Sequence, residues 1–191
     1  MCERCNWSTK NELMIKYHDE EWGVPLFDDQ KLFEFLVLEG FQAGLSWQIV
    51  LNKRESFRKA FDDFDYHKIA NYSDNKVDEL MSNSGIIRNK AKIIGCINNA
   101  KCFMEIQKEF GSFYSYMWEY VNNKPVVNQF QSLSELPAKT ELSDNMSADL
   151  KRRGFKFVGS TVVYAHLQAT GVVNDHLISC FRYSEIKNSY I

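Results

Sequence analysis

A histidine and a cysteine stand four positions apart near the C-terminus, in the stretch VVNDHLISC at residues 172–180. On a helix, side chains at this spacing share one face, with their Cβ atoms about 5–6 Å apart. Imidazole and thiolate are ligands that zinc prefers, and a structural zinc site takes four of them in a tetrahedron. His176 and Cys180 therefore predict one half of a metal site.

The N-terminal stretch CERCNWSTKNELMIKYH offers ligands for the other half. Cys2 and Cys5 have the C-x2-C spacing of a zinc knuckle, but a knuckle normally meets its second pair at short range. Cys5 and His18 are the alternative, and with His176 and Cys180 they would join the two ends of the chain. The spacing is also compatible with a half-buried histidine and a core thiol, because free cysteine is among the most buried residue types.

A second candidate site lies in residues 150–171, LKRRGFKFVGSTVVYAHLQATG. A helix ending at Gly154, a tight turn and a second helix capped by Ser160 or Thr161 would form a helix-hairpin-helix. Backbone N–H groups at the start of that second helix can bind a phosphate. An ordinary corner between two helices explains the same glycine spacing. Phosphate binding is favoured by the flanking basic residues, which are Lys151, Arg152, Arg153 and Lys156.

A third candidate site is LEGFQAGLSW, residues 38–47. Glu39 follows an apolar run on a helix with a buried pattern, and a buried carboxylate is costly unless it has a partner or a purpose. Gly44 loosens the backbone before Trp47 begins the next helix. A carboxylate and an aromatic ring on two sides of a turn would suit a planar, cationic ligand. The spacing by itself favours the alternative, in which Glu39 points to solvent and Trp47 is part of the core.

The basic residues are unevenly distributed in a chain whose net charge is −2. Residues 86–101, which include the stretch GIIRNKAKI, contain Arg88, Lys90, Lys92 and Lys101 but no carboxylate. Residues 150–174 contain no carboxylate either. This pattern argues against binding of nucleic acid by overall charge and permits a local basic face, although a charged run is by default a solvated helix surface.

The elements that must position these residues read almost entirely as helices. Apolar periodicity and capping residues predict helices at 28–41, 46–61, 74–83, 86–110 and 113–121, with a loop at 123–141. No run alternates as a strand does. The 191 residues, 45% of them hydrophobic, are enough for one compact all-α domain. An odd set of five cysteines, without a secretion signal or a membrane-spanning run, indicates a cytoplasmic protein without a disulfide framework.

Five stretches of the chain resemble, in order and spacing, the bacterial DNA-3-methyladenine glycosylase I family. They are YHDEEWGVP, LEGFQAGLSW, GIIRNKAKI, RRGFKFVGST and VNDHLISC. The resemblance implies an all-α, helix-hairpin-helix DNA glycosylase-like fold, with one glycosylase domain at 1–183, the helix-hairpin-helix at about 147–170 and a tail at 184–191. It also implies a monomer that acts on double-stranded alkylated DNA in base-excision repair, without a membrane or an obligate protein partner.

The resemblance also assigns roles to individual residues. One structural zinc would be held by Cys5, His18, His176 and Cys180, which leaves Cys2 as a bystander. The base would be bound by Tyr17, Glu39 and Trp47, with Glu39 as the catalytic group. Gly44 and Leu45 would enter the DNA stack, and the backbone would be bound by Lys156, Gly159 and Thr161. The wider superfamily places a catalytic aspartate two residues before the position of His176, where this chain has Asn174, with Asp175 one place off.

Two other classes of protein are compatible with parts of this pattern. A zinc-stabilised DNA-binding module would use the same hairpin but would not need a pocket at Glu39 and Trp47. A catalytic zinc hydrolase would need an open fourth position at the metal, whereas four candidate ligands indicate a closed, structural site.

Overall fold

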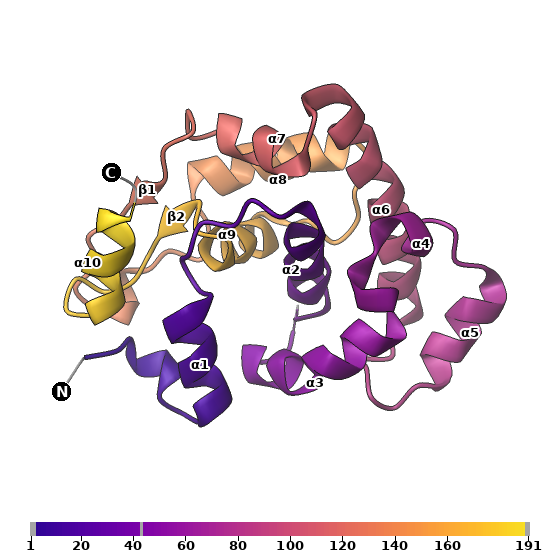
Figure 1. The fold of residues 1–191 in the computed structure, drawn as a ribbon, viewed down its shortest axis with the longest axis horizontal. Helices are drawn as coiled ribbons and strands as arrows, with labels where there is room; N and C mark the ends of the chain where they lie inside the picture. Colours follow the sequence, from indigo (N-terminus) through magenta and orange to yellow (C-terminus); the bar gives the residue numbers. More distant parts are fainter. Residues whose placement is uncertain (1–2, 43, 190–191) are drawn as a thin grey trace.

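The computed structural model describes residues 3–42 and 44–189, and it confirms the predicted helical class (Figure 1). Two-residue strands and short 3-10 turns make up the remaining regular structure. The α-helices of the described residues, in chain order, are α1 Glu12–Glu20, α2 Asp29–Gln42, α3 Trp47–Ala60, α4 Tyr66–Ile69, α5 Asp74–Ser82, α6 Lys90–Phe110, α7 Phe113–Glu119, α8 Glu141–Arg152, α9 Ser160–Ala169 and α10 Phe181–Asn188.

Side-chain caps fix where several helices begin, as the sequence predicted. Ser73 accepts a hydrogen bond from the Lys76 N–H at the start of α5, and Ser112 does the same for Ser115 in α7. Such caps satisfy N–H groups that have no partner inside the helix. The long periodic segment that was predicted to begin at residue 86 instead begins as a helix at Lys90, because Asn89 provides its cap.

The two aspartates at the start of α2, Asp28 and Asp29, accept hydrogen bonds from different helices. Asp28 caps its own helix by accepting a hydrogen bond from the Lys31 N–H. The Asp29 carboxylate reaches across the molecule and accepts hydrogen bonds from the N–H groups of Phe113 and Tyr114. It therefore ties the start of α7 to the start of α2.

A short parallel pair of strands was not predicted. β1, Val126–Val127, pairs with β2, Val173–Asn174, so that Val126 lies opposite Val173. Two residues are too few for a visible alternation, and a parallel pair draws on segments far apart in the chain. The pair places the segment after β2, which contains His176, beside the loop that follows β1.

Helix α2 lies at the centre of the molecule and is buried on all sides over most of its length (Figure 1). One face packs in the larger core, together with residues of α3, α6, α7, α8 and α9. The other face contributes Phe35 to a smaller core, where Met14 and Tyr17 of α1 meet Leu177 and Cys180. Helix α2 therefore contributes to both the larger core and the smaller core, which is formed mainly by the N-terminal and C-terminal segments.

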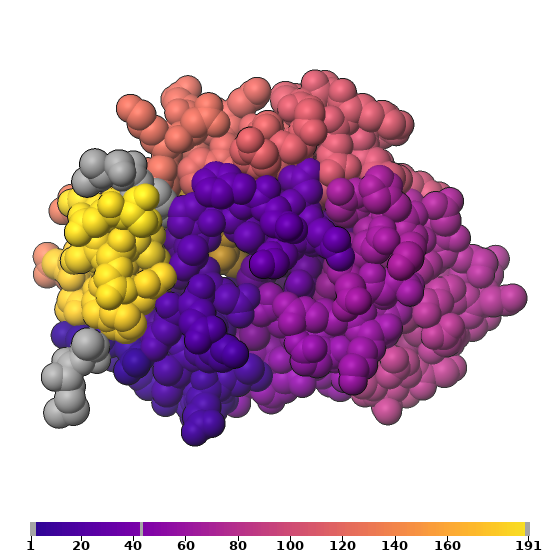
Figure 2. All heavy atoms as spheres, viewed as in Figure 1, coloured from indigo at the N-terminus to yellow at the C-terminus, as the bar shows by residue number. Residues whose placement is uncertain are grey.

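The N-terminal and C-terminal segments lie side by side at one end of the molecule (Figure 2). Helix α10 runs across residue 184, where the tail was expected to begin, and Ile186 within it is buried. The division into a domain at 1–183 and a tail stays a prediction. In the described part of the chain, no helix is long and apolar enough to span a membrane.

Candidate functional site

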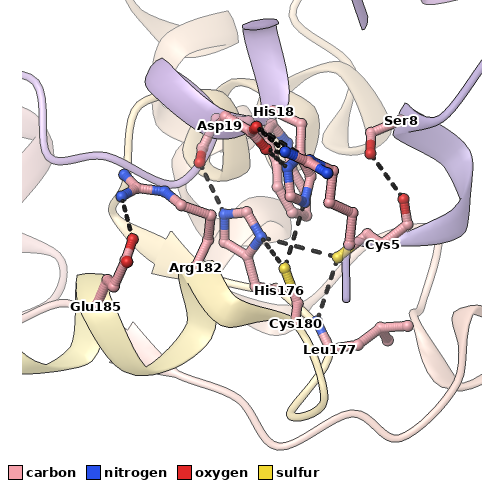
Figure 3. Close-up of polar contacts among 11 residues, drawn as sticks. Cys5, Ser8, His18, Asp19, His176, Leu177, Cys180, Arg182 and Glu185 are labelled. Atoms are coloured by element: carbon pink, nitrogen blue, oxygen red, sulfur yellow. Dashed lines mark hydrogen bonds and ion pairs between the residues drawn. The ribbon is translucent and has the colours of Figure 1, made fainter. Parts of the chain in front are cut away.

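Four side chains from the two ends of the chain converge on one buried point (Figure 3). Cys5 precedes a 3-10 turn, His18 lies on α1, and His176 and Cys180 lie between β2 and α10. Their ligand atoms all lie within 4.8 Å of one another. The Cys180 Sγ is 3.4 Å from His18 Nε2 and 3.5 Å from His176 Nδ1, and the Cys5 Sγ is 3.8 Å from His176 Nδ1.

These separations fit a tetrahedral metal site. With metal–ligand distances of about 2.0–2.3 Å, neighbouring ligand atoms in a tetrahedron lie roughly 3.3–3.8 Å apart. The second nitrogen of each imidazole is already held. His18 Nδ1 lies 2.7 Å from an Asp19 carboxylate oxygen, and His176 Nε2 lies 2.9 Å from the Trp22 carbonyl oxygen. Contacts of this kind orient a metal-binding imidazole, so the cluster can hold a metal through its free nitrogens.

The helix that was expected to carry both His176 and Cys180 does not form. The two residues lie in a turn, closed by a hydrogen bond from the Cys180 N–H to the Leu177 carbonyl oxygen. The expectation was wrong because Asn174 bends the chain here, its side-chain oxygen accepting a hydrogen bond from the His176 N–H. Cys5 lies in this cluster, where it was predicted, and the prediction that Cys2 is a bystander concerns a residue outside the described part of the chain.

The three predicted base-binding residues surround one cavity of about 270 Å³. Tyr17 comes from α1, Glu39 from α2 and Trp47 from the start of α3. The rings of Tyr17 and Trp47 lie with their centroids 5.3 Å apart, tilted by 47°. The Trp47 indole N–H is buried without a hydrogen-bond partner among the described residues. The cavity is therefore lined by two aromatic rings and a carboxyl group, and one of these rings has an unpaired N–H donor.

Glu39 is only 5% exposed, and no side chain of the described residues donates a hydrogen bond to it. Burial disfavours the carboxylate and raises the pKa of Glu39 to about 8. Burial also raises the pKa of Tyr17, and the negative charge of Glu39 raises it further. The alternative in which Glu39 points to solvent is therefore wrong. An unpaired carboxyl group in a cavity marks a place where a complementary ligand would be bound.

Sequence reasoning assigned no base-binding role to the other residues that line this cavity, which are Trp7, Trp22, Gln42, Leu136, Ala165 and Gln168. Trp7 and Trp22 are in edge-to-face contact, with ring centroids 5.0 Å apart, and Gln168 of α9 completes the wall. Trp7 lies in a 3-10 turn and Trp22 in the loop after α1, where apolar periodicity carries no information. Their closeness in the chain to Cys5 and His18 was the only available signal.

The predicted DNA-inserting turn is exposed beside the cavity. Gly44 has φ +87°, a left-handed conformation that glycine adopts without strain. Gln42 fixes this turn from both sides: its carbonyl oxygen accepts from the Leu45 N–H, and its side-chain amide donates to the Leu45 carbonyl oxygen, each at 2.7 Å. Leu45 is 38% exposed, so its apolar side chain is accessible to a partner.

The predicted helix-hairpin-helix corresponds to α8, a turn and α9, which pack against each other. Gly154 ends the first helix with φ +97°. The cap of α9 is Gly159, not Ser160 or Thr161, and no side chain caps it. The first N–H groups of α9 are therefore left for another acceptor. Thr161 is exposed on this first turn.

The basic residues near this turn differ in their partners. Arg152 and Arg153 pair with Asp149, and Arg153 also pairs with Glu109. No carboxylate of the described residues lies within ion-pair distance of Lys156. In the other basic segment, the Lys92 ammonium donates a hydrogen bond to the Phe41 carbonyl oxygen at 3.1 Å. Lys156, like Lys151, is thus exposed without an ion pair among the described residues and could bind an anion at the turn.

The Asp175 carboxylate is held by hydrogen bonds from three side chains. It accepts them from Asn128, from the Tyr164 hydroxyl and from Gln168. Asn174, at the position where the superfamily has an aspartate, donates to the Tyr183 carbonyl oxygen. Neither residue lines the cavity. A larger groove of about 640 Å³, beside Phe27, contains none of the predicted site residues and no acidic side chain.

A small aromatic cavity with a buried carboxyl group, next to an exposed apolar turn and a basic hairpin, fits the class of helical enzymes that take a base out of DNA. The comparisons agree: a family model described as methyladenine glycosylase matches residues 7–183, and the chain belongs to this family.

Relatives and solved structures cover nearly the whole chain. The chain is 47% identical over 181 residues to DNA-3-methyladenine glycosylase 1 of Escherichia coli, covering 95% of this chain and 97% of that protein. A crystal structure of 3-methyladenine DNA glycosylase I matches with a TM-score of 0.91 at 46% identity, covering 94% of this chain and 98% of the other. A variant of such an enzyme in complex with 3-methyladenine matches with a TM-score of 0.90 at 36% identity, covering 93% and 96% of the two chains.

Proposed function

We propose that this chain hydrolyses the N-glycosidic bond of 3-methyladenine in double-stranded alkylated DNA, releasing the free base and leaving an abasic site. The observation that carries the proposal is the cavity that is lined by the unpaired carboxyl group of Glu39 and by the rings of Tyr17 and Trp47. The extent of the similarity to proteins named DNA-3-methyladenine glycosylase supports the choice of substrate.

The substrate explains why the chain needs little catalytic machinery. Methylation at N3 leaves adenine positively charged in DNA, so cleavage of the glycosidic bond expels a neutral base and requires no general acid. The remaining tasks are to extrude the nucleotide, to recognise the lesion and to tolerate positive charge on the sugar. Asn174 at the superfamily's aspartate position is compatible with this chemistry, because the barrier is already lowered by the methyl group.

Glu39 would be the residue that distinguishes the lesion. Burial makes its carboxylate unfavourable in the free protein, and a cationic base in the cavity would favour the ionised form. The carboxylate would then accept hydrogen bonds from the amino edge of the base, while Tyr17 and Trp47 stack on its faces. An uncharged adenine would not compensate the free-energy cost of ionising the buried Glu39 carboxyl group.

The DNA would be held at two places outside the cavity. Leu45, exposed on the turn that Gly44 permits, would fill the space left by the extruded base, as apolar wedges do in other DNA-binding proteins. The free N–H groups at Gly159 and the first turn of α9, with Lys156 and Thr161, would bind backbone phosphate. These contacts carry no sequence information, which suits a repair enzyme.

We further propose that Cys5, His18, His176 and Cys180 hold one structural zinc. The three separations of 3.4–3.8 Å, the burial and the held outer nitrogens support this assignment. With four protein ligands, the metal would have no open position and would serve to cross-link the chain ends. Because His18 adjoins Tyr17 and His176 contacts the Trp22 backbone, that cross-link would hold two walls of the cavity.

The direct test is to incubate the protein with methylated duplex DNA and to identify the released bases by chromatography. Free 3-methyladenine is the expected product. DNA binding without any released base would instead support the non-catalytic DNA-binding module.

A further inference from the structure

The turn between α8 and α9 contains a strained residue. Phe157 has φ +58°, in the left-handed region that a bulky, non-glycine residue rarely adopts. Its side chain is 43% exposed. Strain of this kind persists only where the surrounding structure imposes it, and it is concentrated at functional positions.

Phe157 lies against two helices at places where each has a glycine: its ring against α6, and its Cβ and carbonyl oxygen against α2. A Cβ atom added to Gly95 of α6 would lie 2.7 Å from two carbon atoms of the ring, which is shorter than any normal contact. A Cβ atom added to Gly40 of α2 would lie 3.8 Å from the Phe157 Cβ, an ordinary van der Waals distance. The ring therefore lies directly against the backbone of α6, in a notch that only glycine leaves open.

Two neighbouring asparagines of α6 hold the backbone of the same turn, which passes beside α6 (Figure 1). Asn99 makes a reciprocal pair with Lys156: its amide donates to the Lys156 carbonyl oxygen at 2.8 Å, and its side-chain oxygen accepts from the Lys156 N–H at 2.7 Å. Asn98 donates to the Gly154 carbonyl oxygen at 2.8 Å. The turn is thus fixed on α6 by three hydrogen bonds in addition to the buried edge of the ring.

The notch also lies at the end of α2. Gly40 follows Glu39 directly, and the carbonyl oxygen of Phe41 accepts the hydrogen bond from Lys92 of α6. Phe157, Gly40, Phe41 and Lys92 line the same small hollow. The hairpin, the N-terminal part of α6 and the last turn of α2 therefore form one contiguous packing unit.

We propose that Phe157 is a positioning residue that sets the placement of the phosphate-binding hairpin relative to Glu39 and the Leu45 turn. This inference rests on the proposed function, in which the hairpin binds the DNA backbone while the end of α2 acts on the extruded base. Both contacts must engage the same DNA duplex at the same time, so the distance between them must be fixed. The ring in the notch fixes it, and the strained φ of Phe157 is the cost of directing the ring inward.

Gly95→Ala and Gly40→Ala form a matched pair for the test. Each adds one methyl group to a helix interior facing Phe157, and each raises helix propensity, but only the change at Gly95 drives the ring from its notch. For Gly95→Ala we expect base release from methylated duplex to fall between about tenfold and a hundredfold, the effect of a displacement of roughly 1 Å. Free 3-methyladenine should still quench tryptophan fluorescence as in the parent, and zinc content should be unchanged. Gly40→Ala should resemble the parent in all three measurements.

Phe157→Gly provides an independent variant, because it removes both the ring and the strain and keeps the chain free to adopt the turn. It should show the same loss on duplex DNA with intact binding of the free base, and adding Gly95→Ala should cause no further loss. Parental base release by either Gly95→Ala or Phe157→Gly would overturn the inference, as would an equal loss in Gly40→Ala and Gly95→Ala. If the parent itself releases no 3-methyladenine, it is the proposed function that fails.

Discussion

Replacement of Glu39 by glutamine should change how the stability of the free protein depends on pH. The folded state raises the pKa of this carboxyl group from 4.5 to about 8, through burial. A raised pKa of an acid means that the folded protein binds the proton more tightly than the unfolded chain does. Protonation of Glu39 therefore stabilises the folded state relative to the unfolded chain. This contribution to the free energy of unfolding is complete below about pH 4.5 and is lost as the pH rises towards 8. A shift of this size corresponds to at most roughly 4–5 kcal/mol, lost at about 1.4 kcal/mol per pH unit.

Glu39→Gln keeps the shape of the side chain and removes its ionisable group. Because all other ionisable groups are the same in the two proteins, the difference in their pH dependence reports on Glu39. Urea unfolding at a series of pH values from 5 to 8.5, at saturating zinc, gives the free energy of unfolding of each. The difference between parent and variant should change by several kcal/mol across this range, in favour of the variant at high pH. Parallel curves would refute the argument, because they would mean that Glu39 is ionised at no cost in the free protein.

Three other changes test separate parts of the molecule. Cys180→Ser should lower the zinc content and the melting temperature together. Cys102→Ser, at a half-buried thiol outside the cluster, is the control and should leave the zinc content intact. One zinc per chain in Cys180→Ser would contradict the ligand assignment. Trp47→Ala should weaken binding of free 3-methyladenine by about 1–3 kcal/mol through lost stacking, measured by calorimetry, without loss of zinc. Lys156→Ala should weaken binding to damaged and undamaged duplex alike and reduce the slope of log affinity against log salt by about 1; a loss of lesion discrimination at unchanged affinity would exclude its role at the backbone.

The sequence was most informative where the chemistry depends on local order. Apolar periodicity predicted the buried helix α2, and the cost of a buried carboxylate drew attention to Glu39 on it. The spacing of His176 and Cys180 indicated a metal site although the helix on which that argument relied is absent. The turn that replaces this helix brings the same two side chains together, so their predicted clustering is confirmed although the helix is not, and metal binding by the cluster stays a prediction.

Features that depend on contacts between distant segments could not be predicted in this way. The resemblance, not the spacing, selected Cys5 and His18 as the partners of the C-terminal pair. The contact of Phe157 with Gly95 leaves no trace in either segment alone, because a glycine within a helix has no signature of what packs against it. The placement of Trp7 and Trp22 in the cavity wall also depends on contacts between distant segments. It could not be predicted from apolar periodicity, because each residue lies outside the α-helices.

The central claim is that a preformed cavity recognises the methylated base, and titration of the protein with free 3-methyladenine tests it most directly. Because the cavity is present without DNA, the base should bind alone and quench the fluorescence of Trp47. Above about pH 8, where the carboxyl group of Glu39 is ionised, adenine should bind much more weakly, and Glu39→Gln should lose roughly 1.5–3 kcal/mol of affinity for the methylated base, the range for a hydrogen bond to a charged group. The absence of any heat or fluorescence change at millimolar 3-methyladenine, or parental binding by Glu39→Gln, would contradict the account.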